Sequence, residues 1–113
     1  MPHYLLSVHH GDGDVLPDGV DPQSVFAAVE AFNSRLEADG VLVYAGGLQP
    51  ASTARTAHRD GEVTEGPRLS GEEYMGGFWV VQAADDAAAM ELAKAAVATG
   101  CSWAVEVRPF QTG

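Results

Sequence analysis

His9 is the residue of this chain best suited to proton transfer. The reference pKa of an imidazole is about 6.5, so a histidine can act as a general acid or base near neutrality. Ser7 lies two residues earlier, and the alternation of apolar and polar residues over 3–9 places both on one face of an expected strand. No motif marks His9 as a base, so a strand-end histidine that is simply hydrogen-bonded or solvated stays the alternative interpretation.

Glu106 and Arg108 form a second polar pair, near the end of the chain. They alternate with Val105 and Val107, so the charged side chains are expected on one face of a strand and the valines on the other. If the valines pack under helices, the charges point away from the helices, and buried charges need partners. Two interpretations stay open: an ion pair that orders an interface, or an Arg108 that binds a ligand carboxylate or phosphate through its two-pronged guanidinium.

Glycine pairs and an acidic loop are the remaining candidates. The Gly-Gly pairs at 46–47 and 76–77 would let backbones approach one another or a ligand, and we favour bulges that curve the sheet. His9, Asp12 and Asp14 could approach a metal, but their spacing matches no metal-binding motif. Nucleotide-binding, haem-attachment and Ser/His/Asp motifs are also missing from the sequence. We therefore expect no metal and no cofactor.

The composition limits the partners that the chain can bind. It has 16 Asp+Glu against 6 Lys+Arg, a formal net charge of −10. Such a surface repels phosphate backbones and anionic lipids, so we expect neither nucleic acid nor a membrane as partner. Cys101 is the only cysteine, which excludes an intrachain disulfide and agrees with a reducing cytoplasm. We expect a cytoplasmic protein, because the first residues resemble no signal peptide and no apolar run approaches the roughly 20 residues that span a bilayer.

Hydrophobic periodicity predicts one domain over residues 1–113, with two helices. Asp21 favours the start of the first helix, and Asp85 or Asp86 the start of the second. Asp60-Gly61 predicts a two-residue hairpin turn. The expected strands are 3–9, 41–48, the hairpin arms 53–58 and 62–64, then 78–83 and 103–110; the expected helices are 22–38 and 87–99, the second with an apolar stripe of Met90, Ala93 and Val97.

This order of elements is that of a ferredoxin-like α+β domain with a hairpin insertion. Strand–helix–strand occurs twice, and two such halves form a four-stranded antiparallel sheet with both helices on one face. The other face carries Leu5, Val80, Phe110 and either Phe78 or Trp79. Because an apolar face needs cover, we expect it to pack against a second copy in a homodimer.

Five groups of residues share their order and spacing with a known family. They are Tyr4-Leu5-Leu6, Gly46-Gly47-Leu48-Gln49-Pro50 with Ser52-Thr53-Ala54, Arg59-Asp60-Gly61, Gly76-Gly77-Phe78 and Val105-Glu106-Val107-Arg108-Pro109. Together they resemble the YCII-related family, in particular its DGPF-motif branch, and the resemblance implies a dimeric α+β barrel in which two sheets face each other. The sequence departs from that branch where Glu65-Gly66-Pro67-Arg68 replaces Asp-Gly-Pro-Phe.

A second departure concerns chemistry. Some YCII-like proteins pair a histidine of the first helix with an aspartate before proline in the second, and this pair is implicated in lyase-type reactions. The expected helix 22–38 contains no histidine, and the expected helix 87–99 contains no Asp-Pro. The pair therefore has no counterpart in this chain.

The antiparallel order is expected to bring chemistry-bearing residues to one end of the sheet. The end of the first strand should lie near the starts of the Phe78 and Trp103 strands, and the segment 44–49 should arrive at the same end. We expect a pocket there, roofed by the irregular segment 65–75. The predicted catalytic residues are His9 and Arg108, and the predicted substrate-binding residues are Ser7, Tyr44, Gln49, Phe78, Trp103 and Glu106.

Two functions fit this arrangement, and the sequence leaves open whether the protein is an enzyme. The first is a cofactor-free barrel that binds a small molecule or transforms it by lyase- or hydrolase-type chemistry. The alternative is a non-enzymatic homodimeric interaction or accessory module. A cofactor-independent oxygenase is a third hypothesis, which rests on fold analogy alone.

Overall fold

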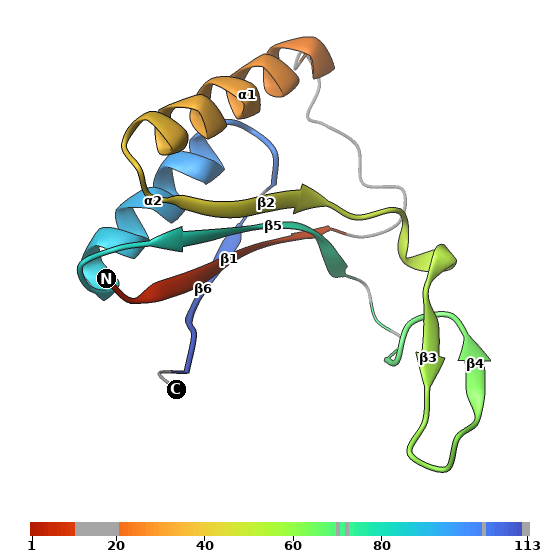
Figure 1. The fold of residues 1–113 in the computed structure, drawn as a ribbon. Helices are drawn as coiled ribbons and strands as arrows, with labels where there is room; N and C mark the ends of the chain where they lie inside the picture. The colour runs from red at the N-terminus through yellow and green to blue at the C-terminus, as the bar shows by residue number, and fades with distance from the viewer. Residues whose placement is uncertain (11–20, 70, 72, 103, 112–113) are drawn as a thin grey trace.

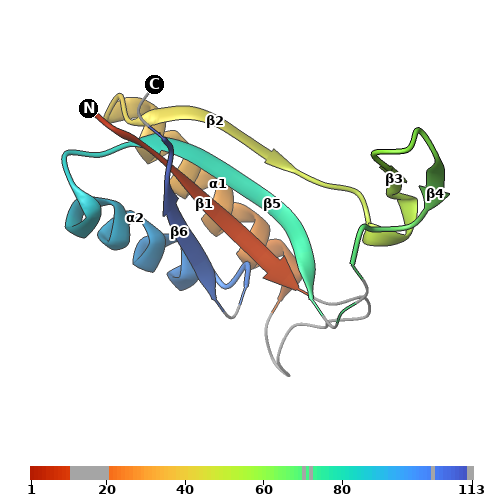
Figure 2. The same ribbon diagram turned by 90° about the horizontal axis from the view of Figure 1, so that it is seen from below.

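The computed structural model describes residues 1–10, 21–69, 71, 73–102 and 104–111. Its main sheet has four antiparallel strands in the order β2-β5-β1-β6, with both helices on one face (Figure 1 and Figure 2). Without the β3–β4 hairpin, this is the ferredoxin-like α+β arrangement that the sequence predicts. The elements are β1 (His3–His10), α1 (Pro22–Ala38), β2 (Leu42–Gly47), the 3₁₀ turn η1 (Ala51–Thr53), β3 (Arg55–Ala57), β4 (Val63–Glu65), β5 (Tyr74–Gln82), α2 (Asp86–Ala98) and β6 (Val105–Pro109).

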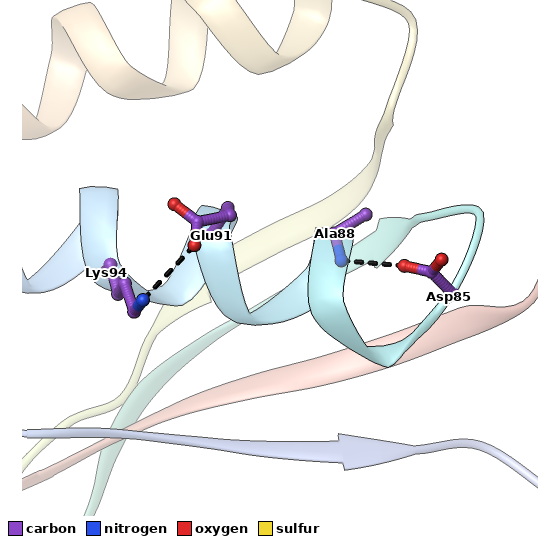
Figure 3. Close-up of polar contacts among 4 residues, drawn as sticks. All are labelled: Asp85, Ala88, Glu91 and Lys94. Atoms are coloured by element: carbon purple, nitrogen blue, oxygen red, sulfur yellow. Dashed lines mark hydrogen bonds and ion pairs between the residues drawn. The ribbon is translucent and has the colours of Figure 1, made fainter.

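Each helix begins after an aspartate whose side chain accepts a hydrogen bond from the first turn. Asp21 accepts from a backbone N–H at 3.0 Å, and Pro22 takes the first helical position of α1. Asp85, rather than Asp86, caps α2 by accepting from the Ala88 N–H at 2.8 Å (Figure 3). These hydrogen bonds set the first residue of each helix, and hence which residues of the helix face the sheet.

The core lies between the helices and the sheet. Tyr4, Leu6 and Val8 of β1 alternate onto the helix-covered face and are buried. Trp79 of β5 packs edge-on against Phe32 of α1, with ring centroids 5.4 Å apart. The other buried apolar residues are Leu36, Val81, Ala83, Ala89, Ala93 and Ala96.

The predicted apolar stripe of α2 is wrong for two of its three residues. Met90 and Val97 are exposed, at 45% and 36%, while Ala93 is buried. The helix turns Ala89, Ala93 and Ala96 to the core instead. Helix packing distances depend on the side chains at the contact, so a face of alanines lets α2 lie close to the sheet.

The face of the main sheet opposite the helices is covered by no described element, and we call it the open face (Figure 2). Strand register determines its members, because residues paired across strands point to the same side. It includes Leu5, Ser7, His9, Tyr44, Gly46, Met75, Phe78, Val80, Glu106 and Arg108.

β5 begins at Tyr74 rather than at Phe78, which corrects the predicted boundary. Gly76 does not end the strand, because it forms the extra residue of a β-bulge where the β1–β5 register shifts between Val8 and His9.

The turn of the hairpin also differs from the prediction, since it has three residues, 59–61, rather than two. The Gly61 N–H donates to the His58 carbonyl at 2.9 Å, and the His58 N–H donates to the Glu62 carbonyl at 2.7 Å. A two-residue type I′ turn needs positive φ at both central residues, whereas here only Gly61 has it, at +93°. Asp60 instead accepts a hydrogen bond from the Glu62 N–H at 2.9 Å.

β3 and β4 form a separate two-stranded sheet, the hairpin arm, which projects from one end of the main sheet (Figure 1 and Figure 2). Figure 1 shows it extending away from the helices. The radius of gyration is 15.6 Å, above the value of about 13 Å for a compact domain of roughly 100 residues. Among the described residues, no helix is long and apolar enough to cross a membrane.

Candidate binding site

A groove of about 260 Å³ opens on the helix-covered side of the sheet, between α1 and the ends of β2 and β5. We call it the helix-side groove. It lies at the end of the sheet where the sequence predicts a pocket. Its lining consists of Val8, Val29, Asn33, Ala45, Gly46, Gly47, Gly76, Gly77, Phe78 and Trp79.

Glycines form one wall of the helix-side groove. Gly77 pairs with Gly47, and a Cβ at Gly77 would lie 3.1 Å from the Gly46 carbonyl oxygen, so a side chain there would require the β2 backbone to move by a few tenths of an ångström. A Cβ at Gly47 would meet no atom within 4 Å, so that position faces open space. The predicted bulge is confirmed at Gly76 but is wrong for Gly46 and Gly47, which pair in register with Phe78 and Gly77.

Asn33 contributes an amide to the otherwise apolar lining. Its Oδ1 accepts a hydrogen bond from Trp79 Nε1 at 2.6 Å. Indole N–H is a donor only, so the amide oxygen must face it and the two Nδ2 N–H donors point elsewhere. Sequence analysis missed Asn33, although Val29, Asn33 and Leu36 share one helical face, and a polar residue inside an apolar stripe is a detectable signal.

On the opposite side of the sheet, Ser7 and His9 are hydrogen-bonded. Ser7 Oγ lies 2.9 Å from His9 Nε2, which confirms that the two side chains share a face. Ser7 is only 1% exposed although no element covers this face, because register places it between Phe78 and Glu106. Ser102 Oγ donates to the His9 carbonyl at 3.1 Å and so holds the end of β1.

The two predicted catalytic residues do not meet within one chain. Arg108 pairs with Leu5, four positions along β1 from His9. At a strand rise of roughly 3.3 Å per residue, this separates them by about 13 Å. Arg108 and Glu106 are both exposed, and neither forms an ion pair with any described residue.

Comparison with known families gives one match. The family model of the YCII-related domain matches residues 4–111, nearly the whole chain. The chain belongs to the YCII-related domain family. No curated protein matches it. The match does not distinguish branches of the family, so membership of the DGPF branch stays a prediction, with the departure at 65–68 unexplained.

Of the other predicted site residues of this YCII-related domain, Phe78 and Glu106 pair with Ser7 on the open face. Tyr44 is 62% exposed and stacks on Phe78, with ring centroids 5.9 Å apart, on the open face. Gln49 is exposed and does not line the helix-side groove. The segment 65–75 is predicted to roof the pocket. None of its described residues lines the helix-side groove, so these residues form no roof over it.

Three residues that the sequence singled out, Trp103, Asp12 and Asp14, lie outside the described residues. Their predicted roles stay predictions. Within the described part of the domain, no group of three or more His, Cys, Asp or Glu side chains could hold a metal ion.

A tyrosine with a raised pKa lies on the helix-covered side of the sheet. The Tyr4 hydroxyl donates to Asp86 Oδ1 at 2.8 Å and so connects β1 to the start of α2. This hydrogen bond raises the pKa of Tyr4, and burial of the ring and the negative charges of Asp86 and Asp85 raise it further.

Proposed function

We propose that this YCII-related domain binds a small molecule without a cofactor, in a site formed when the open faces of two copies pack together. The Ser7–His9 hydrogen bond carries the proposal. It places a group capable of acid/base chemistry beside apolar surface, on a face that the single chain leaves uncovered.

The composition of the open face supports a dimer. Antiparallel sheets with one solvated face normally alternate polar residues onto that face. Here Leu5, Phe78 and Val80 occupy its centre and are half-buried, and Tyr44 beside them is largely exposed. Apolar surface of this kind typically marks an interaction site. A two-fold contact between two open faces would bury it against itself.

The hairpin arm is a second feature that favours another copy of this chain as the partner. An isolated two-stranded hairpin is only marginally stable in water, so the arm is expected to contact a second surface. It extends on the side of the sheet that the open face looks toward (Figure 1).

Within this site we assign His9 the role of general acid or base and Arg108 the role of anion anchor. Because the two residues are about 13 Å apart in one chain, a ligand that reaches both must be elongated. The proposed catalytic residues are His9 and Arg108, and the proposed ligand contacts are Ser7, Tyr44, Gln49, Phe78, Trp103 and Glu106.

A ligand screen tests these roles. Thermal-shift screening of small carboxylates and phosphates against the wild type is repeated with His9→Gln and Arg108→Gln. The matched controls are His3→Gln, at the far end of β1, and Lys94→Gln, on the outer surface of α2. We expect hits whose affinity falls at least tenfold in the first two variants and is unchanged in the controls. Hits that bind His9→Gln as well as the wild type would overturn the assignment.

The alternative is a homodimeric interaction or accessory module that is not an enzyme. It is favoured by one observation, namely that Glu106 and Arg108 are exposed and form no ion pair with any described residue. In this case the two residues pair across the interface. A dimer that yields no hits, and that Glu106→Gln and Arg108→Gln each weaken, would select the alternative. We also propose a cytoplasmic location, which the single free thiol of Cys101 supports.

A further inference from the structure

The helix-side groove shares Gly46 and Phe78 with the open face, but α1 forms its other wall, on the side of the sheet away from the Ser7–His9 pair. We infer that the groove is a second binding site, for a small, neutral, mostly apolar molecule that carries a carbonyl oxygen. Its occupation does not require the open face to bind anything.

The walls of the groove determine the size and polarity of the ligand. Its volume of about 260 Å³ lies just below the roughly 300 Å³ at which pockets accept drug-sized ligands, so the occupant is smaller than these. Val8 and Val29 contribute aliphatic side chains, and Trp79 contributes an aromatic one. At Gly47 the wall has no side chain and no atom within 4 Å of where a Cβ would lie, which leaves room for part of a ligand.

Asn33 determines where the polar atom of the ligand lies. Its amide oxygen is held by Trp79 at 2.6 Å, so its orientation is set by the protein before any ligand binds. Its Nδ2 group donates no hydrogen bond to any other described residue, although the side chain is half-buried. Nδ2 is not fully buried, because every fully buried polar side-chain atom of the described residues has a partner. It can therefore donate to water, and an acceptor atom on the ligand would replace that water.

Charge selects a neutral acceptor over an anionic one. No Lys, Arg or His is among the residues that line the groove, and the chain as a whole carries −10. A carboxylate would lose water there without gaining a cation. A ketone, ester or amide oxygen accepts the same hydrogen bonds without that loss. The groove is thus suited to a neutral carbonyl compound.

Two positions of β2 provide a matched pair of variants. Gly47 pairs with Gly77 on the helix side, and a side chain there would enter the groove without a clash. Val43 lies in the same strand, is 47% exposed and is not among the residues that line the groove. Gly47→Val therefore fills the groove, while Val43→Ala changes the same strand but leaves the groove empty.

The experiment uses three probes of similar size on the full chain: acetophenone, ethylbenzene and benzoate. Titrations are followed by ¹H–¹⁵N NMR at the backbone amides of Gly47 and Gly77, the Asn33 side-chain amide and the Trp79 indole. We expect acetophenone to shift these signals. Ethylbenzene lacks the acceptor for one hydrogen bond, so its affinity should be about fivefold lower than that of acetophenone. The affinity of benzoate should be lower still. Gly47→Val should weaken acetophenone at least tenfold, and Val43→Ala should leave its binding unchanged.

Three results would overturn the inference: acetophenone shifts confined to open-face residues, equal binding of acetophenone and ethylbenzene, or benzoate binding more tightly than acetophenone. A Gly47→Val variant that keeps the wild-type spectrum elsewhere and still binds acetophenone normally would also overturn it. Failure of the His9 screen would not affect these outcomes, because no signal used here belongs to the open face.

Discussion

The two faces of the main sheet are built from alternate residues of the same strands, yet only one of them is completed by the chain. On the helix side, Leu6 is fully buried and its neighbours Tyr4 and Val8 are nearly so. On the open face, Leu5 is only half-buried beside a histidine and a serine. The same strand thus contributes to a finished core and to a surface that still contains apolar groups. The comparison indicates that the hydrophobic core is complete on the helix side. The open face keeps partly exposed apolar groups, and we place the proposed interface there.

The largest expected effect comes from neighbouring leucines of β1. Leu6→Ala should lower the free energy of unfolding by about 3 kcal/mol, because it leaves a cavity in a fully buried position. Leu5→Ala should lower it less, and its effect should depend on protein concentration because Leu5 lies in the proposed dimer interface. Urea denaturation at two protein concentrations measures both. Equal losses that do not vary with concentration would show that the open face is core in the single chain.

A charge on the open face sharpens the comparison. Val80→Glu places an unpaired carboxylate at the centre of the proposed interface and should weaken the dimer by at least about a hundredfold. Met90→Glu, on the exposed surface of α2, is the control and should leave association unchanged. Sedimentation velocity over a concentration series distinguishes them. A Val80→Glu protein that associates like the wild type would exclude the open face as the interface.

A smaller effect is expected on the outer helix surface, which belongs to neither face of the sheet. Asp85→Ala removes the cap of α2 and should cost about 1 kcal/mol. Lys94→Ala breaks the Lys94–Glu91 ion pair at 3.1 Å, whose side chains are 66% and 72% exposed, and should change stability by less than about 0.5 kcal/mol (Figure 3). Thermal denaturation compares the stabilities of the variants. A larger loss of stability for Lys94→Ala than for Asp85→Ala would contradict the view that the cap stabilises the helix more than the ion pair does.

The smallest expected change is the pH dependence of the Tyr4–Asp86 hydrogen bond. The raised pKa of Tyr4 means that this bond stabilises the fold fully below the usual tyrosine pKa of 10.0 and is lost as pH rises through the raised value. The stability difference between wild type and Tyr4→Phe should therefore be constant from neutral pH to about pH 10 and shrink above it. Denaturant unfolding from pH 7 to 11 measures it, and a difference that grows at high pH would contradict the sign.

The local features that depend on short-range chemistry could be predicted from sequence. The alternation of β1, the Asp21 cap with Pro22, and the order of the elements followed from period, capping and turn preferences. Predictions failed where tertiary context decided the outcome. Met90 looked like a core residue of α2, but a close helix–sheet distance selected Ala89, Ala93 and Ala96 instead.

The candidate site could be predicted only as a location. Gly46, Gly47, Gly76 and Gly77 do gather at the expected end of the sheet, because antiparallel pairing places them there. Sequence periodicity does not say on which side of the sheet a cavity lies. That side depends on where Asn33 and Val29 of α1 sit above the strands, which is a property of helix packing.

Light scattering on the wild type at tens of micromolar, coupled to size exclusion, tests the central claim that the open face is completed by a second copy. The account predicts a particle of twice the chain mass of 11.8 kDa. A particle of 11.8 kDa across the concentration range would contradict it, since the apolar centre of the open face would then be exposed to water without a partner.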